Sequence, residues 1–239
     1  MSNVTLRRSN ITITTQKKTA ESPRNTRKYG GKEALARQQE RKAKLLAAGI
    51  KLIGREGFNA TSIDAICAEA GLTKRYFYES YESTNVLLLE AYQAVIIEFL
   101  VSIQQATQPY LSDAKALVHA GLRQTFTFVA DHPDKARLIM IEAMSVRAQL
   151  GHLYGKGYGH FVGLLVLFTK PFLKGDTTSD VMLTVMAKAM VGSLIHLCQG
   201  WIATDFKQPI EELVQGMEII FAGMAKELGI LGWSNPQVT

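Results

Sequence analysis

The stretch TSIDAICAEAGLTKRYFYESY, from Thr61 to Tyr81, decides the fold, because its pattern predicts two short helices joined by a tight turn. Thr61 and Asp64 have the spacing of a capping box, which supplies an oxygen for free amides and an acid at the positive helix end. A helix should therefore begin near Ser62. Gly71 stands where a left-handed C-cap ends that helix. This layout is that of a helix-turn-helix.

The second helix of the pair should begin after Thr73, a residue suited to the N-cap position. Phe77 and Tyr81, four residues apart, suit its inner face. The side chains that remain for an outward face, where a DNA groove would lie, are Lys74, Arg75, Tyr76, Tyr78 and Ser80. We therefore expect a DNA recognition helix. For Tyr78 two roles stay open, a hydroxyl contact with a DNA phosphate and packing in the core.

The chain of 239 residues is 47% hydrophobic, enough for one large or two modest domains. Its longest uncharged apolar run, Phe161 to Thr169, is shorter than the roughly 18 residues of a membrane span. The start of the chain lacks the apolar core of a secretory signal. We expect a cytoplasmic protein that does not enter a membrane. Cys67 and Cys198, which stand among apolar neighbours, should be reduced core residues.

Positive charge is concentrated in the first part of the chain. Residues 1–92 hold 16 Lys and Arg against 9 Asp and Glu, whereas the remainder holds 11 against 12. A basic end on a near-neutral body is typical of a nucleic-acid-binding protein, because phosphate neutralisation supplies most non-specific affinity. A membrane surface would attract the same charge, but the apolar residues of the first predicted helix are spaced to pack under the motif.

Residues 1–31 carry seven basic side chains against one acid, Glu21, and should form a disordered basic arm. Two roles stay open for this arm, contact with the minor groove or DNA backbone and a solvated tail with little effect on specificity. From Lys32 to Glu56 the apolar residues recur at helical spacing and predict a helix that ends at Gly57.

The run from Leu45 to Tyr92 resembles the DNA-binding domain of the TetR family of transcriptional regulators. The resemblance is carried by Gly57-Phe58, Thr61-Ser62, Ile66, Ala70-Gly71-Leu72-Thr73, Tyr78, Tyr81 and Leu87-Leu88. It implies a helix-turn-helix domain over residues 32–92 that binds double-stranded DNA. It also implies DNA contacts from the start of the motif's first helix and from the recognition helix, namely Thr61, Ser62, Lys74, Arg75, Tyr76, Tyr78 and Ser80.

Three positions depart from the family pattern. Arg75 stands where many relatives have a small residue, and a bidentate contact with guanine would give it about 1–3 kcal/mol of base discrimination. Thr84 replaces a phosphate-binding lysine and can donate one hydrogen bond to a phosphate. Glu79, on the groove side, would repel DNA unless it accepts a hydrogen bond from a cytosine amine, and both outcomes stay open.

The rest of the chain predicts more helices and no strand, so the expected fold class is all-α. Ser83 should cap a long helix that runs to the Pro109 region and connects two domains. Further helices should run from Asp113 to Asp131, from Asp134 through Met144, from about Ser179 to Asp205 and from Pro209 to Leu228. In the region before the turn at residues 175–178, five glycines between Gly151 and Gly163 should make a helix kink or open.

The last two predicted helices each have an apolar face. The faces comprise Met182, Met186, Ala189, Ser193 and His196 on one helix, and Leu213, Met217, Ile220, Phe221 and Met224 on the other. Two recognition helices reach successive major grooves only from a two-fold symmetric dimer. The faces therefore fit a four-helix homodimer interface, which is also the arrangement in the family.

The resemblance implies that residues 93–239 form a helical domain for dimerisation and for a small, largely apolar effector. The candidate ligand-binding residues are Phe126, Met140, Met144, Tyr154, Tyr158, His196 and Trp201. Apolar spacing alone does not separate a pocket residue from a core residue, so each keeps core packing as its alternative. For His196 that alternative is a buried, hydrogen-bonded histidine.

Together these features predict a transcriptional repressor that a small apolar effector releases from a palindromic operator, with activation kept as an alternative. An architectural DNA-binding protein without an effector is a second reading, and a helical enzyme with a dispersed active site is a third. His152 and His160 are eight residues apart, which is not the spacing of a helical metal pair. The glycine-rich stretch lacks the strand and Gly-Lys-Ser/Thr of a phosphate loop, so no metal and no cofactor are expected.

Overall fold

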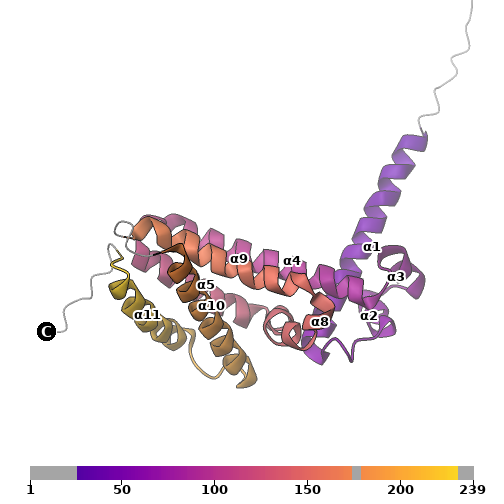
Figure 1. Ribbon diagram of the computed structural model, residues 1–239. Helices are drawn as coiled ribbons and strands as arrows, with labels where there is room; N and C mark the ends of the chain where they lie inside the picture. Colours follow the sequence, from indigo (N-terminus) through magenta and orange to yellow (C-terminus); the bar gives the residue numbers. More distant parts are fainter. Residues whose placement is uncertain (1–25, 174–178, 231–239) are drawn as a thin grey trace, which may run out of the picture. The chain divides into compact units, whose positions relative to one another are not determined.

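The computed structural model describes residues 26–173 and 179–230, and every regular element in these two ranges is a helix (Figure 1). The prediction of an all-α fold is confirmed. The N-terminal part contains α1 (Thr26–Glu56), α2 (Ile63–Ala70) and α3 (Lys74–Ser80). The helices that follow are α4 (Thr84–Thr107), η1 (Gln108–Tyr110), α5 (Ala114–Asp131), α6 (Pro133–Arg137), η2 (Leu138–Glu142), α7 (Ala143–Ser145), α8 (Arg147–Leu150), α9 (His152–Thr169), η3 (Lys170–Phe172), α10 (Asp180–Ala203) and α11 (Ile210–Glu227).

Helix α1 begins at Thr26, before the predicted start at Lys32, so the end of the predicted arm is helical. Residues 1–25, the rest of that arm, lie outside the described residues, as does the predicted turn at residues 175–178. The chain divides into two compact units between Arg37 and Gln38. The first unit contains the start of α1, and the second contains the helix-turn-helix and all later helices.

Local side chains fix the ends of the two motif helices. Ser62, rather than Thr61, caps α2, because its hydroxyl oxygen accepts a hydrogen bond from the amide of Ala65 at 3.1 Å. Gly71 ends α2 in the left-handed region, with φ 64° and ψ 33°, as the sequence predicted. Thr73 occupies the N-cap position of α3, but its side chain makes no capping hydrogen bond.

The helix-turn-helix is held by a core that it shares with α1 and the start of α4. Phe77 and Tyr81 face inward as predicted, with 0% and 2% of their surface exposed. They belong to the same buried cluster as Leu45, Ile53, Ile66, Leu87 and Leu88. Burying one side chain of this size stabilises a fold by about 1.5–3 kcal/mol, so a few such residues hold the short helix α3 in place.

Helix α4 is the central element of the helical body. It packs against both α5 and α9, and Figure 1 shows α4 and α9 side by side. Phe99 of α4 stacks on Phe128 of α5 with ring centroids 4.6 Å apart, and it meets Phe161 of α9 at 5.1 Å. The remaining long helices cover this layer, α10 on α9 and α11 on α5.

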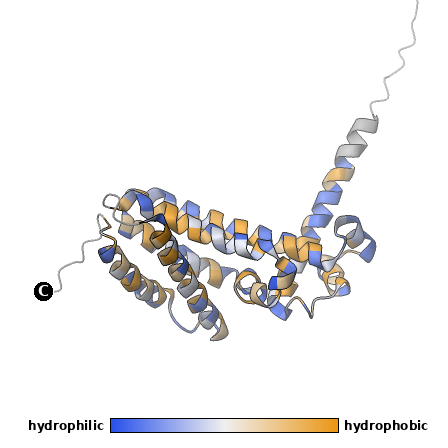
Figure 2. Ribbon diagram, viewed as in Figure 1, coloured by the Kyte–Doolittle hydropathy of each residue, from blue (hydrophilic) through white to orange (hydrophobic). Residues whose placement is uncertain are grey.

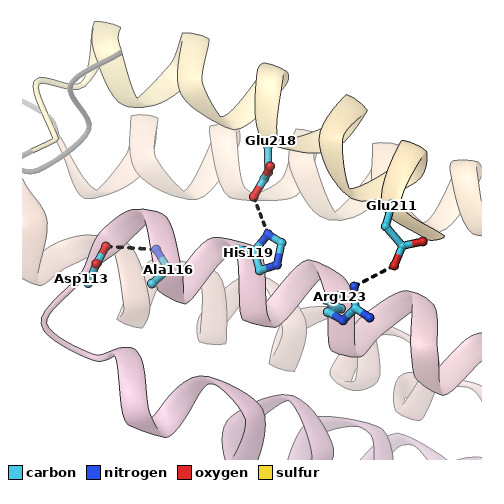
Figure 3. A network of polar contacts seen from close by, with 6 residues as sticks. All are labelled: Asp113, Ala116, His119, Arg123, Glu211 and Glu218. Atoms are coloured by element: carbon cyan, nitrogen blue, oxygen red, sulfur yellow. Dashed lines mark hydrogen bonds and ion pairs between the residues drawn. The ribbon is translucent and has the colours of Figure 1, made fainter. Parts of the chain in front are cut away.

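Polar contacts run along the surface between α5 and α11 (Figure 3). His119 Nδ1 lies 2.9 Å from Glu218 Oε1, and Arg123 Nη1 donates to Glu211 Oε1 at 2.8 Å. Exposed ion pairs contribute little to stability, typically about 0–1 kcal/mol. The buried apolar side chains of α11, rather than these pairs, therefore supply most of its attachment.

Two predicted helices differ from what the structure shows. The helix expected from Asp134 through Met144 is interrupted by a π-helical turn, η2, which separates α6 from α7. The glycine-rich stretch does not open, because α9 runs without interruption from His152 to Thr169. The break lies just before it, at Gly151, whose φ of 54° favours glycine.

Two segments, Thr84–Tyr110 and Asp180–Ala203, are long and apolar enough to cross a membrane by length and composition alone. Helices from the core of globular proteins pass the same test. The first segment contains α4, which contributes nine buried residues to the core. The second contains α10, which exposes Val181, Met182 and Val185 on its outward face. The predicted cytoplasmic location stays a prediction.

Gly54 allows α1 to approach the start of α6 closely. A Cβ atom at this position would lie 2.6 Å from the backbone carbonyl carbon of Asp134. Gly54→Ala should therefore lower the free energy of unfolding by about 1–3 kcal/mol through overpacking, despite the roughly 1 kcal/mol that alanine adds to helix propensity. Urea unfolding monitored by circular dichroism measures this change.

Gly163 in the middle of α9 is the matched control, because a Cβ atom there meets nothing within 4 Å. Gly163→Ala should raise the free energy of unfolding by about 0.5–1 kcal/mol. Equal stabilisation by both alanines would contradict the close approach of α1 to α6.

Candidate nucleic-acid interface and ligand cavity

The two basic residues at the start of α3 are exposed and already engaged with acids of the same domain. Lys74 Nζ pairs with Asp64 Oδ1 at 2.8 Å, and this bond raises the pKa of Lys74. Arg75 Nε donates to Glu79 Oε1, one turn further along α3, at 2.9 Å. The Arg75 side chain has 84% of its surface exposed, so its terminal guanidinium nitrogens face solvent.

Glu79 lies between two arginines. Besides accepting from Arg75, its second oxygen lies 3.9 Å from Arg41 of α1. The Arg41 guanidinium also covers the ring of Tyr76, 4.5 Å from its centroid. Glu79 is therefore compensated by cations in the free protein and holds Arg75 by one nitrogen. Sequence reasoning missed Arg41, because only the packing of α1 on α3 brings it to the recognition helix.

The other predicted DNA contacts differ in how much surface they offer. Tyr78 is 60% exposed and meets the ring of Phe77 edge to face at 5.6 Å, which excludes core packing for its own ring. Ser62 is exposed, whereas Ser80 and Thr84 are half-buried. Thr61 is a correction: it is 8% exposed, and its hydroxyl donates to the Gly57 carbonyl at 2.8 Å. This residue holds the turn before α2 and offers almost no surface to DNA.

The helix-turn-helix itself is close to neutral. Residues 32–92 carry nine Lys and Arg and eight Asp and Glu, so nearly all of the excess positive charge at this end belongs to residues 1–31. Besides the pairs on α3, Lys42 pairs with Glu90 at 2.8 Å, and Lys51 pairs with Glu69. The local basic patch that the overall charge suggested is therefore largely compensated by acids of the same domain.

The helical body contains a partly open apolar cavity of about 150 Å³, lined mainly by α4, α5, α9 and α10. Four of the predicted ligand-binding residues line it, namely Met140, Met144, Tyr154 and Tyr158. Most of the remaining wall is aliphatic or aromatic and includes Ile96, Phe99, Ile103, Leu122, Phe161, Leu164, Met190 and Leu194. A site of this composition suits an apolar ligand.

Three predicted ligand-binding residues do not line this cavity. Phe126 and Trp201 are buried and pack edge to face at 5.8 Å, and the Trp201 indole nitrogen donates to the carbonyl of Gln208 at 2.9 Å. They are core residues. His196 does not line the cavity and is exposed on α10 of the single chain, on the face predicted to meet a second copy. Periodicity placed these side chains on helix faces without telling which face borders a cavity.

The π-helical turn η2 connects the cavity to the helix-turn-helix. Ile139 and Met140 line the cavity, and the side-chain amide of Gln199 on α10 donates to the Met140 carbonyl at 2.6 Å. At the other end of the same turn, Glu142 Oε2 accepts from the backbone amide of Phe58 at 3.1 Å, in the loop between α1 and α2. One short segment thus touches both sites.

The described ranges hold no group of three or more His, Cys, Asp or Glu placed to bind a metal ion. Cys67 and Cys198 are buried and free, as predicted, and burial raises the pKa of the Cys198 thiol to about 12. These two thiols therefore stay protonated inside the core.

A short helix-turn-helix with an exposed recognition helix, attached to a helical body, defines a DNA-binding protein of the helix-turn-helix class. The family model of bacterial regulatory proteins, tetR family, matches residues 45–91. These residues match the DNA-binding domain of the TetR family, so the resemblance that the sequence predicted for this domain is confirmed.

A curated relative, the uncharacterized HTH-type transcriptional regulator YerO of Bacillus subtilis (strain 168), is 37% identical over 104 residues. The match covers 43% of this chain and 36% of the relative. The matched part thus spans about a third of the relative's length.

Solved structures of transcriptional regulators share the fold. The fatty acid degradation regulator FadR from Bacillus halodurans has a TM-score of 0.64 at 14% identity, covering 75% of this chain and 93% of its own. A TetR-like regulator from Rhodococcus sp. RHA1 has a TM-score of 0.63 at 22% identity, covering 77% and 96%. FadR from Bacillus subtilis, solved in complex with stearoyl-CoA, has a TM-score of 0.62 at 15% identity, covering 80% and 98%.

Arg75→Ala should remove the preference for guanine at one position of each half-site, because a bidentate arginine contact is worth about 1–3 kcal/mol of discrimination. Selection of sites from a random double-stranded DNA library, followed by sequencing, measures this preference. Glu79→Ala should keep the guanine preference but weaken it, and should raise overall affinity, because the side chain that fixes Arg75 and repels phosphates is gone.

Lys44→Ala is a control for loss of one cation, since Lys44 pairs with Glu40 on the exposed side of α1. It should leave every base preference unchanged. An Arg75→Ala protein that selects the wild-type site would contradict base readout by Arg75.

Proposed function

We propose that this protein is a homodimeric transcriptional repressor that a small apolar effector releases from a near-palindromic operator. The observation that carries the proposal is that one segment, η2, touches both sites. Its residue Met140 lines the cavity, and its residue Glu142 accepts a hydrogen bond from Phe58 in the loop between α1 and α2. The family assignment of residues 45–91 supports DNA binding. The DNA contacts we propose are Ser62, Lys74, Arg75, Tyr76, Tyr78, Ser80 and Thr84.

A homodimer is supported by exposed apolar side chains on α10 and α11, two helices that contain hydrophobic residues along their length (Figure 2). Met182 and Val185 of α10 are 54% and 55% exposed, and Ile219 and Ile220 of α11 are 68% and 48% exposed. Most of the face predicted for α11 is wrong: Leu213 and Met217 are buried, and Phe221 and Met224 pack against the core of the same chain. Exposed apolar side chains that gather on two neighbouring helices mark an interaction site. A second copy is the partner we propose, because a symmetric dimer places two recognition helices about 34–36 Å apart on successive major grooves.

In the proposed mechanism, a ligand between α4, α9 and α10 displaces Met140 and with it the turn η2. Glu142 then shifts against the amide of Phe58, and the loop between α1 and α2 moves with it. The ligand changes operator affinity only by its different affinity for the two arrangements, and such couplings are typically about 5–150-fold. Bacillus subtilis FadR, a neighbour in fold, was solved with stearoyl-CoA, which supports a ligand site in this kind of body.

Two other functions would give different results in the same assay. An architectural DNA-binding protein would leave the operator when salt is raised and would not respond to ligands. An enzyme would turn a ligand over. One assay distinguishes the three functions. The protein bound to a labelled operator duplex is titrated at fixed salt with 2-nonanone or with stearoyl-CoA. Fluorescence anisotropy reports release of the operator, and product analysis reports turnover of the ligand. Release without turnover at constant salt supports the repressor.

Ile219→Glu should convert the dimer to a monomer, because it places a charge in the proposed apolar interface without a partner. Analytical ultracentrifugation measures the association, and anisotropy should show at least a tenfold loss of operator affinity. Ile97→Glu on α4 is the control, because Ile97 is also an exposed isoleucine, at 52%, but lies outside α10 and α11. A stable Ile219→Glu dimer would contradict this interface.

Glu142→Ala should keep ligand binding and operator binding but reduce the coupling between them to less than about threefold, because the bond to Phe58 is lost. Calorimetry with and without operator DNA measures the coupling. Glu218→Ala is the matched control. The Glu218 carboxylate also links two parts of the fold, but through His119 it joins α11 to α5. Full coupling in Glu142→Ala would show that the signal travels by another route.

A further inference from the structure

The cavity carries no charged group on its described walls. Its lining on α4 extends from Tyr92 to Thr107, which is about 22 Å at a helical rise of about 1.5 Å per residue. A lining that follows one helix this far suits an unbranched chain better than a fused ring system. A buried charge without a partner costs several kcal/mol, so such a wall disfavours anions and cations.

Most polar groups of the wall are engaged with the protein itself. The hydroxyls of Thr107 and Thr125 donate to backbone carbonyls one turn earlier, each at 2.8 Å. Tyr158 donates to the carbonyl of Lys188 at 2.8 Å, and Tyr154 donates to the sulfur of Met144 at 2.6 Å. Their hydrogen atoms are not free for a ligand without loss of these bonds.

Tyr92 is different from these four residues. It lines the cavity and is only 4% exposed, yet its hydroxyl has no hydrogen-bond partner among the described residues. Burial, with a smaller effect from Tyr154, raises the pKa of Tyr92 to about 12, so the phenol stays protonated at neutral pH. A protonated hydroxyl without a partner is a donor available for a ligand oxygen.

The position of this hydroxyl is defined by α9. A Cβ atom at Gly157 would lie 2.5 Å from Tyr92 Oη and 3.2 Å from its Cζ atom, so the glycine admits the end of the ring. Tyr92, Met140 and Met144 all line the cavity. Met140 belongs to η2, the turn that also bonds the loop between α1 and α2 through Glu142.

We infer that the cavity binds an uncharged, chain-like apolar molecule whose single hydrogen-bond acceptor, a ketone, ester or alcohol oxygen, bonds to the Tyr92 hydroxyl. The chain extends along α4 toward Thr107 and Leu117, where the wall offers no free donor. Free carboxylates are disfavoured because no cation lines the site. The inference rests on the proposed function, because it names the effector class of the same cavity.

The test uses the full-length protein, calorimetry without DNA and three probes of similar length: 2-nonanone, 1-chlorooctane and nonanoate at pH 7.5. The wild-type protein should bind 2-nonanone and should bind nonanoate at least tenfold more weakly. Tyr92→Phe should weaken 2-nonanone binding about 3- to 10-fold, as expected for one neutral hydrogen bond. It should leave binding of 1-chlorooctane, a poor acceptor, within twofold.

Tyr158→Phe is the matched control, because it lines the same cavity but donates its hydroxyl to the protein backbone. It should weaken both neutral probes equally or not at all. Three results would each overturn the inference. The first is failure of the wild-type protein to bind 2-nonanone, and the second is binding of nonanoate as tight as that of 2-nonanone. The third is equal weakening of the binding of both neutral probes by Tyr92→Phe.

Operator release is measured separately, so the two proposals fail in different ways. Tyr92-dependent binding of 2-nonanone without any change in operator affinity would support the ligand class and contradict the repressor function. Release of the operator by stearoyl-CoA, with no Tyr92-dependent ketone binding, would support the repressor and contradict the ligand class.

Discussion

The junction between α1 and the segment from α6 through η2 is the constraint on which the rest of this structure depends. Gly54 brings α1 against the backbone of α6, and the Phe58 amide that follows α1 bonds to Glu142. Packed interfaces of this kind shift between discrete arrangements rather than deforming continuously, because interiors are close-packed. The helix-turn-helix is therefore attached to the part of the body that borders the cavity.

The recognition helix shows how specificity and affinity can come from different parts of one chain. On α3 each cation has an acidic partner, so the helix adds little net attraction for phosphates but holds Arg75 and Tyr76 in defined positions. Attraction for DNA depends on uncompensated charge, which lies almost entirely in residues 1–31. A dependence of operator affinity on this arm would follow from charge alone, whatever its conformation.

Much of the fold could be predicted from sequence because helix ends are local. Gly71, Ser83 and Asp113 each terminate or cap a helix through bonds to residues three or four positions away, so both partners lie within one short stretch of sequence. The same reasoning misplaced the first cap by one residue, from Ser62 to Thr61. It could not detect the π-helical turn η2, whose neighbours in the fold come from distant parts of the chain.

The candidate sites were only partly predictable for a related reason. Met140 and Trp201 are both apolar and helical, and the three-dimensional packing alone decides that one lines the cavity and the other fills the core. Arg41 reaches Glu79 and Glu142 reaches Phe58 across many intervening residues. Periodicity identifies a face of a helix, but what covers that face depends on the other helices.

Helix α10 shows the consequence most clearly, because it is apolar on two opposite sides. One side, with Met190 and Leu194, lines the cavity, and the other exposes Met182 and Val185 to a second copy in the proposed dimer. A helix that is apolar on both sides resembles a membrane span by composition, although in the proposed dimer both sides would have partners. Because the same rigid helix would contact effector and second subunit, a ligand that shifts α10 would also change the distance between the recognition helices.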